Sequence, residues 1–154
     1  MRFFFAFLLL LPVSALAETI SGRVVSVADG DTLTILTTEK TEIKIRLAAI
    51  DAPEKAMPFG QQSKQSLSEL CFRKQATAET VDIDRYGRTV AAITCEGVLA
   101  NDAQVKNGLA WVYRKHSKGF EHLFPLEDAA KASGIGLWAD KGPTPPWEWR
   151  KASR

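Results

Sequence analysis

The sequence predicts an α+β protein that is mainly β: a five-stranded barrel of the OB type with about three helices packed around it. Two observations carry this prediction. Five short segments rich in β-branched residues lie between residues 19 and 94, separated by turn signals. A segment with helical spacing follows the third of them, and two more follow the fifth. Short strands with an inserted helix suit a small closed barrel with helices around it.

The first three strands are expected at residues 19–28, 32–37 and 42–50. An Asp-Gly pair at 29–30 is a turn signal, so the first two strands should form a hairpin. The third strand alternates Ile43, Ile45, Leu47 and Ala49 with Lys44, Arg46 and Ala48, which places the two sets on opposite faces. Prolines 53 and 58 then interrupt the pattern.

The remaining elements follow from spacing and end signals. Leu67, Leu70 and Cys71 recur at helical intervals and predict a helix over residues 61–72. Asn101 is a favourable N-cap residue for a short helix that Gly108 would end. The other expected elements are strands at 76–83 and 89–94, a helix from Pro125 to about Gly134, and little regular structure from Gly142 onward.

The first seventeen residues are expected to be a signal peptide rather than part of the fold. Arg2 precedes a continuous apolar run over residues 3–11, and Ala15-Leu16-Ala17 matches a small-x-small cleavage site. The alternative is a membrane anchor, but the run is shorter than the roughly 20 residues that span a bilayer. The expected domains are therefore a signal peptide, 1–17, and one compact domain, 18–154, that is periplasmic or secreted.

Charge and cysteines narrow the function classes further. The formal net charge is +2, or +1 without Arg2, so overall charge does not identify a nucleic-acid binder. An anionic partner would need a local cluster of charge. Export favours a disulfide between the two cysteines, Cys71 and Cys95, over two buried free thiols.

Two acids at strand ends are the first candidate for chemistry. Asp31 opens the second strand and Asp51 closes the third. If they converge at one rim of the barrel, they would repel each other unless a cation lies between them. Hard oxygen ligands suit Ca²⁺ or Mg²⁺, and there is no His or Cys cluster for a softer metal.

Three further charged residues accompany these acids. Arg46 and Arg88 could grip phosphate oxygens and stabilise charge in a transition state. Glu54 lies one tight turn after Asp51 and could position or deprotonate a water molecule. Each feature also has a plain structural explanation: Asp-Gly-Asp as a turn, an arginine facing solvent, and Tyr-Gly-Arg as a hairpin turn. From the residues alone, two alternatives remain open: an anion or phosphate site, and a set of charged residues with purely structural roles.

Several segments together resemble the staphylococcal nuclease, or thermonuclease, family. In the family's order they read VVSVADGDTLTI, IRLAAIDAPE, DIDRYGRTVAAI, NDAQVKNGLAWVY and GLWAD, and they extend from Val24 to Asp140. The resemblance implies a calcium-dependent phosphodiesterase on an OB-type barrel. Such enzymes cut DNA and RNA with little sequence preference and leave 3′-phosphate ends.

The resemblance also assigns roles to individual residues. Asp31 and Asp51 match the family's calcium-binding carboxylates, and Ala52 takes the position of a threonine whose main-chain carbonyl binds the metal. Alanine keeps that carbonyl but lacks the hydroxyl. Glu54 matches the residue that orients the attacking water. Arg46 and Arg88 match the two phosphate-binding arginines.

Weaker candidates flank the expected site. Trp111 and Tyr113 could stack on a nucleobase, although core packing is the alternative for both and the stronger one for Trp111. We expect His116 at the surface. The tail PPWEWRKASR has aromatic and basic residues and would either touch nucleic acid or fold against the barrel.

The sequence thus predicts an exported Ca²⁺-dependent nuclease, monomeric and without membrane insertion after cleavage. Its expected partners are single- and double-stranded DNA and RNA. Two rival hypotheses belong to other classes: a non-catalytic nucleic-acid-binding OB module, and an interaction partner of another envelope protein. The intact set of five charged side chains argues against both.

Overall fold

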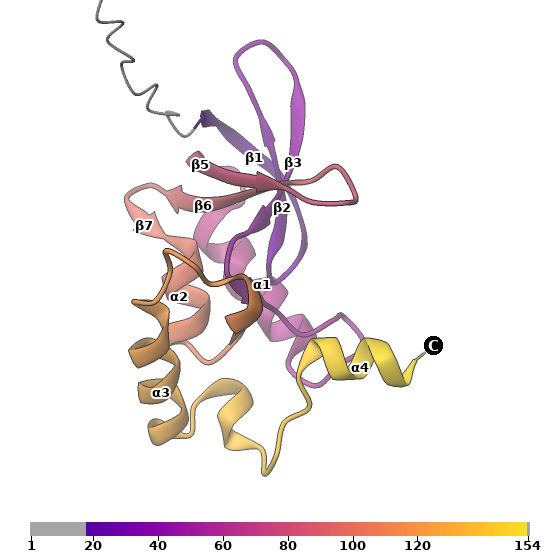
Figure 1. Cartoon of the computed structure of the whole chain (residues 1–154). Coiled ribbons are helices and arrows are strands. Elements are labelled where there is room, and N and C mark those ends of the chain that lie inside the picture. The colour runs from indigo at the N-terminus through magenta and orange to yellow at the C-terminus, as the bar shows by residue number, and fades with distance from the viewer. Residues whose placement is uncertain (1–17, 154) are drawn as a thin grey trace, which may run out of the picture.

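The fold is a closed five-stranded barrel, which confirms the predicted class. The computed structural model describes residues 18–153. The barrel strands are β1 (Thr19–Asp29), β2 (Thr32–Leu36), β3 (Glu42–Leu47), β5 (Gln75–Ile83) and β6 (Thr89–Cys95). They pair antiparallel in the order β3-β2-β1-β5-β6, and a parallel pairing of β3 with β6 closes the barrel. Figure 1 shows this barrel above the helices.

Helices cover the lower part of the barrel (Figure 1). Within the described residues, the four α-helices are α1 (Gly60–Cys71), α2 (Ala100–Lys106), α3 (Leu123–Ser133) and α4 (Pro146–Ala152). The short elements are β4 (Ile50–Asp51), β7 (Val98–Leu99), β8 (Trp111–Val112) and the 3₁₀ turns η1 (Arg114–His116) and η2 (Gly136–Ala139). Three of the four α-helices correspond to the helices expected from the sequence.

The barrel interior is filled by the alternate positions of its strands. Leu33, Ile35, Ile45 and Ile93 are fully buried, and Leu67 of α1 joins them. Their neighbours along each strand point outward, as the twofold periodicity of a strand requires. The same alternation of apolar and polar residues in the sequence predicts these strands.

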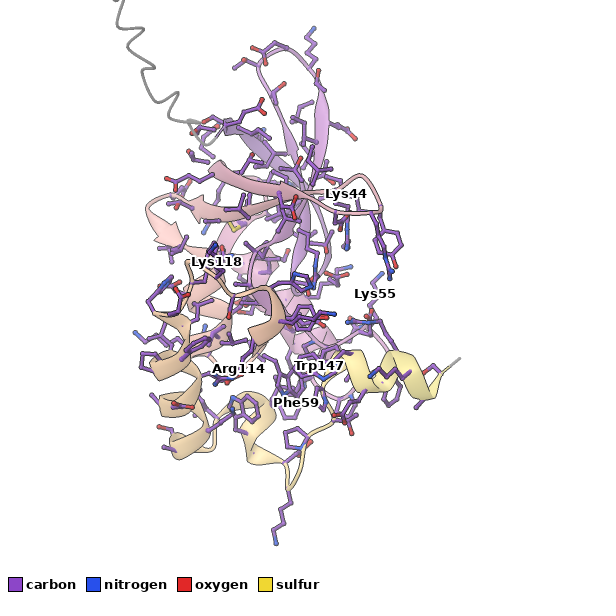
Figure 2. All side chains as sticks on the ribbon, in the orientation of Figure 1. Lys44, Lys55, Phe59, Arg114, Lys118 and Trp147 are labelled. Carbon is purple, nitrogen blue, oxygen red and sulfur yellow. A yellow bond between two sulfur atoms is a disulfide. The ribbon has the colours of Figure 1, made fainter. Side chains whose placement is uncertain are left out.

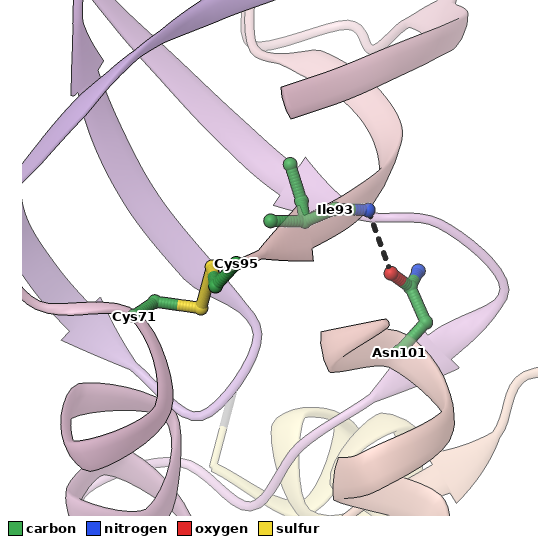
Figure 3. Close-up of a disulfide and its surroundings, with 4 residues drawn as sticks. All are labelled: Cys71, Ile93, Cys95 and Asn101. Atoms are coloured by element: carbon green, nitrogen blue, oxygen red, sulfur yellow. Dashed lines mark hydrogen bonds between the residues drawn. A yellow bond between two sulfur atoms is a disulfide. The ribbon is translucent and has the colours of Figure 1, made fainter. Parts of the chain in front are cut away.

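A disulfide joins α1 to the barrel, which confirms the predicted pair (Figure 3). Cys71 is the last residue of α1 and Cys95 the last of β6, with 5.3 Å between their Cα atoms. Both cysteines are buried. The bridge therefore fixes the helix against the strand that begins directly after Arg88.

The third strand is shorter than expected. Instead of continuing to residue 50, β3 ends at Leu47, and Ile50 and Asp51 form β4, which pairs with β8. Ala49 between them has φ 63°, and its carbonyl accepts from the Tyr113 N–H at 2.7 Å. A positive φ breaks the strand. The sequence does not reveal this break, because a positive φ is usually marked by glycine and position 49 is an alanine.

Three local expectations need correction. Asn101 does not cap α2: Leu99 occupies the N-cap position without a side-chain cap bond, and Asn101 is buried within the helix. The helix expected from Pro125 begins at Leu123, although it ends at Gly134 as expected. The tail was expected to lack regular structure, but it forms α4, whose start is set by two prolines.

The expected signal peptide, residues 1–17, lies outside the described residues. Within residues 18–153, no helix is long and apolar enough to cross a membrane.

Candidate active site at the barrel rim

The two predicted acids are brought together by one arginine. Register pairs Thr32 of β2 with Arg46 of β3, which places Asp31 beside the Arg46 side chain. Arg46 Nη1 lies 2.8 Å from Asp31 Oδ1, and Arg46 Nη2 lies 3.3 Å from Asp51 Oδ1. Arg46 Nη2 also donates to the Ile50 carbonyl at 3.2 Å. Arg46 thus bridges the acid at the start of β2 and the acid at the end of β4.

Asp31 is held by its own neighbours as well. Its Oδ1 accepts from the Thr32 hydroxyl at 2.9 Å, and its Oδ2 accepts from the Ala52 N–H at 2.8 Å. The second contact ties Asp31 directly to the segment that carries Asp51. Asp31, Asp51 and Ala52 are all buried. The three residues predicted to hold a metal therefore form one cluster.

The turn before Asp31 has a glycine at position 30 because its neighbours leave no room for a side chain. A Cβ at this position would overlap the Ser63 hydroxyl of α1 and lie 2.9 Å from the Ala52 Cβ. The Gly30 carbonyl accepts from the buried Gln104 amide at 2.7 Å. The turn is thus pressed between α1, α2 and the Ala52 segment, so glycine is required by close approach rather than by φ.

Burial and ion pairing act in opposite directions on the acids. Burial raises the pKa of Asp31, but Arg46, the Ala52 N–H and Thr32 outweigh it, so the pKa lies below its ordinary value. For Asp51, burial dominates over its arginine partners and raises the pKa. Burial also raises the pKa of the nearby Asp29 to about 6, with help from the charge of Asp31. The pKa of Asp31 thus favours its carboxylate form, whereas burial and the nearby charge of Asp31 disfavour the charged form of Asp51.

A residue of α4 completes the cluster. Arg150 Nη2 lies 2.6 Å from Asp51 Oδ2, and Arg150 Nη1 lies 2.7 Å from Glu54 Oε1. Glu54 is thus joined to Asp51 through a second guanidinium. The tail was expected either to touch nucleic acid or to fold against the barrel, and in the structure it folds against the barrel. No signal in the sequence connects Arg150 to acids about a hundred positions earlier.

Arg88 lies near the cluster in the fold but is held elsewhere. Parallel pairing of Arg46 with Val90 places the start of β6 beside Arg46. The Arg88 side chain, however, donates to Asp84 Oδ2 from Nε at 2.7 Å, and its guanidinium lies 5.4 Å from the Tyr86 ring centre. In this structure Arg88 does not contact Asp31 or Asp51. Asp84 is a partner that the sequence analysis did not name.

The aromatic candidates divide between core and surface. Trp111 is 5% exposed and packs edge-on against Trp138, which favours its core alternative. Tyr113 is half-buried and stacks on Trp147 of α4, with 5.4 Å between ring centres. His116 is exposed, as expected, and its ring lies 5.0 Å from that of Tyr113. Figure 2 shows Trp147 at the start of α4, on the side toward the barrel.

Two buried polar residues position the rim, and the sequence analysis missed both roles. Asn101 accepts from the Ile93 N–H at 2.9 Å and donates to the Ala48 carbonyl at 2.9 Å, which fixes the chain between β3 and β4 (Figure 3 draws the bond to Ile93). Glu127 of α3 is 2% exposed and accepts from the Val112 N–H at 2.8 Å. It anchors β8, the partner of β4. A buried acid on an exposed-looking helix has no sequence signal.

The donor set fits a hard divalent cation. Asp31 and Asp51 would supply carboxylate oxygens, and Ala52 would supply a main-chain carbonyl, the ligand types that Ca²⁺ prefers. Both cysteines are consumed by the disulfide. Among residues 18–153, no three His, Cys, Asp or Glu side chains are arranged as a ready-made cation site, and arginines pair with the two acids. The suitability of this site for a divalent cation therefore depends on two carboxylates, one carbonyl and the charge balance around them.

Fold and site define a class: an OB-type barrel with a carboxylate–arginine cluster at its rim, of the kind suited to phosphate esters. The sequence model described as "Staphylococcal nuclease homologue" matches residues 44–140, more than half of the chain. The chain therefore belongs to the staphylococcal nuclease family. This confirms the resemblance found in the motifs.

Individual relatives agree with this assignment. An "Uncharacterized endonuclease" of Haemophilus influenzae is 46% identical over 86% of this chain and 74% of its own length. "Micrococcal nuclease" of Shigella flexneri is 35% identical over 97% of this chain and 90% of its own. "Protein ParB" of Escherichia coli is 37% identical over 86% and 80%, respectively. Each alignment covers most of both chains.

Proposed function

We propose that this protein is an exported nuclease that uses Ca²⁺ to hydrolyse DNA and RNA, with little sequence preference and 3′-phosphate products. The observation that carries the proposal is the buried Asp31–Arg46–Asp51 cluster with Glu54 beside it. Family membership supports nuclease activity in general. The calcium requirement, the substrates and export belong to the proposal.

Asp31, Asp51 and the Ala52 carbonyl would hold the cation. Ca²⁺ at this position would neutralise charge on the phosphate and on the acids. The Asp31, Asp51, Glu54 and Arg46 side chains together carry a formal charge of about −2, which a divalent cation balances. Mg²⁺ should support little turnover, because its strict octahedral shell suits a flexible mixed site less well.

The chain's own residues have separate tasks in hydrolysis. Arg46 is fixed by both acids and would meet the negative oxygens of the phosphate. Glu54 would accept a proton from the attacking water, which requires its carboxylate to be free of Arg150. Arg88 would bind phosphate after leaving Asp84, and the 24% exposure of its side chain leaves it accessible. Proton removal and charge stabilisation are thus assigned to different elements.

Substrate would approach along the side of the molecule that carries exposed basic residues. Lys44 lies two positions before Arg46 on β3 and shares its face. Lys55 directly follows Glu54, and Figure 2 shows both lysines on the same side as α4. Such lysines hold phosphates without reading sequence. Tyr113 would supply a stacking surface for a base.

A digestion assay tests the proposal. Purified protein is incubated with single-stranded DNA, double-stranded DNA and RNA, in Ca²⁺, in Mg²⁺ and in excess chelator, and product ends are analysed. We expect cleavage in Ca²⁺ and none in chelator. Cleavage at full rate in excess chelator would contradict the metal assignment. Tight binding of single-stranded DNA without cleavage in any cation would instead favour the non-catalytic nucleic-acid-binding module. A protein that neither binds nor cleaves nucleic acid would favour the interaction partner of another envelope protein.

Variants locate the active site within the protein. Glu54→Gln should lower kcat while leaving Ca²⁺ binding intact, and Asp51→Ala should weaken Ca²⁺ binding so that added Ca²⁺ partly restores activity. Arg88→Ala should lower kcat by on the order of 10²-fold, and Arg88→Lys should recover little, because a point charge cannot form a bidentate contact. Glu69→Gln, an exposed residue of α1, is the charge-matched control. Near-normal turnover of Glu54→Gln and Arg88→Ala at saturating Ca²⁺ would place catalysis elsewhere.

A further inference from the structure

Helix α4 lies across the acids through a single arginine. Arg150 bridges Asp51 and Glu54 with one nitrogen on each, at 2.6 and 2.7 Å. Its Nη1 also lies 3.3 Å from Asp51 Oδ1. Bonds of this length between charged groups are the strong kind. Arg150 thus joins the C-terminal helix to a metal ligand and to the proposed general base at once.

With Arg150 in place, the acids have few oxygens to offer a cation. Asp51 Oδ1 faces Arg46, and Asp51 Oδ2 faces Arg150. Both oxygens of Asp31 are bonded as well, to Arg46, Thr32 and the Ala52 N–H. Arg150 supplies positive charge to a cluster that carries a formal charge of about −2 without it. Its guanidinium therefore does electrostatically part of what a bound cation would do.

The same helix covers the aromatic residue of the site. Trp147 lies nearly parallel to Tyr113, with an interplanar angle of 25° and 5.4 Å between ring centres. A ring stacked in this way occupies a face that a nucleobase would otherwise use. Trp147 and Arg150 are one helical turn apart, so α4 blocks both features by one placement. The Arg150 ion pairs and the Trp147–Tyr113 stacking are separate contacts that place α4 over the same part of the barrel rim.

The attachment of α4 includes few fully buried groups. Pro146 is the only fully buried residue of this seven-residue helix, Trp147 and Trp149 are half-buried, and the Arg150 side chain is 40% exposed. A segment containing Gly142, with φ 75°, precedes the helix and connects it to η2. Elements with little buried surface open at low cost in free energy.

We infer that α4 is a built-in cover of the site, and that Arg150 competes with the divalent cation for Asp51 and Glu54. Cation binding then requires α4 to move away from the barrel rim, which also uncovers Tyr113. The inference rests on the proposed function, because the cation is the one proposed there. It differs from a role of Arg150 as a third phosphate-binding arginine, in which α4 would stay in place and keep its slow amide exchange when Ca²⁺ binds.

Calorimetric titration with Ca²⁺ alone, without substrate, tests the competition. Arg150→Ala and Arg150→Met remove the charge, and Lys151→Ala removes the same charge from the neighbouring exposed position of α4. If α4 covers the site about nine-tenths of the time, losing the contact should tighten apparent Ca²⁺ binding roughly 10-fold. Lys151→Ala should stay within about 2-fold of the unmodified protein.

The outcomes separate this inference from the proposed function. Equal Ca²⁺ affinity in the unmodified protein and both Arg150 variants would overturn the cover and leave the metal site intact. Weaker binding in the Arg150 variants would overturn it in favour of a supporting role. No Ca²⁺ binding by any of the proteins would overturn both the cover and the proposed metal site.

Hydrogen exchange provides a second readout that does not depend on activity. Amide exchange in residues 146–152 should become faster when saturating Ca²⁺ is added, because the cation displaces the helix. Arg150→Ala should show fast exchange in this segment already without Ca²⁺, and Lys151→Ala should not. Unchanged or slower exchange of α4 on Ca²⁺ addition would contradict the inference.

Discussion

Asn101 connects barrel stability to the position of the acids, so its loss should be costly. The residue is fully buried, and its amide bonds both the Ile93 N–H and the Ala48 carbonyl at 2.9 Å. A third contact, to the Ala91 carbonyl, is longer at 3.4 Å, and that carbonyl keeps its bond from the Ala48 N–H. Asn101→Ala would therefore leave two main-chain groups without these partners.

The expected magnitude follows from those two groups. Each buried main-chain group that loses its partner costs about 1–3 kcal/mol. We expect Asn101→Ala to lower the free energy of unfolding by about 3–4 kcal/mol, and Tm by roughly 10 °C for a domain of this size. Activity should fall further than stability alone explains, because Ala48 lies between Arg46 and Asp51.

Urea denaturation followed by circular dichroism, with the disulfide intact, measures this loss. Asn107→Ala is the matched control: it is the same substitution at an exposed position that ends α2, and it should change stability by less than about 0.5 kcal/mol. A loss below about 1 kcal/mol for Asn101→Ala, indistinguishable from the control, would refute the reasoning.

Three other predictions follow from single contacts. Asp84→Ala removes the bonds to Arg88 Nε and to two turn N–H groups, so kcat should fall on the order of 10-fold although Arg88 is still present. The control Asp82→Ala, at an exposed position, should have little effect on kcat. Equal kcat for the two variants would contradict a positioning role of Asp84. Gly30→Ala should destabilise by about 1–3 kcal/mol in thermal unfolding because its Cβ would overlap Ser63, and normal Tm would refute the close approach. Reducing the disulfide should lower the free energy of unfolding by about 3 kcal/mol, measured as a shift in urea midpoint, with catalysis retained at low temperature; loss of catalysis while the protein remains folded would show that the bridge shapes the site.

Local patterns in the sequence were sufficient for the barrel. Alternation along residues 32–36 and 42–47 indicates which side chains fill the interior, because successive side chains of a strand point to opposite faces. Gly134 ends α3 as expected, in the left-handed conformation that glycine adopts easily. The cysteine pair was predicted from the presence of two cysteines behind an expected signal peptide, and the structure joins them. The first two inferences depend on a residue and its near neighbours, and the third depends only on the number of cysteines.

Contacts distant in sequence decided the rest. The break at Ala49 depends on the Tyr113 N–H that bonds its carbonyl, and the burial of Asn101 depends on the Ile93 and Ala48 main chain. Neither position carries a local signal, since alanine is an unusual residue for a positive φ and asparagine commonly caps helices.

The site divides in the same way. Arg46, Asp51 and Glu54 could be named from one short segment, because strand ends and the turn after them carry the chemistry. That Arg46 bridges both acids was decided by the register of β2 against β3, which sets Thr32 opposite Arg46. That Arg150 lies on Asp51 and Glu54 was decided by the return of the chain at α4. Sequence determines which charged groups are available, and packing determines which of them share the same small volume, because electrostatic interaction depends on distance in space.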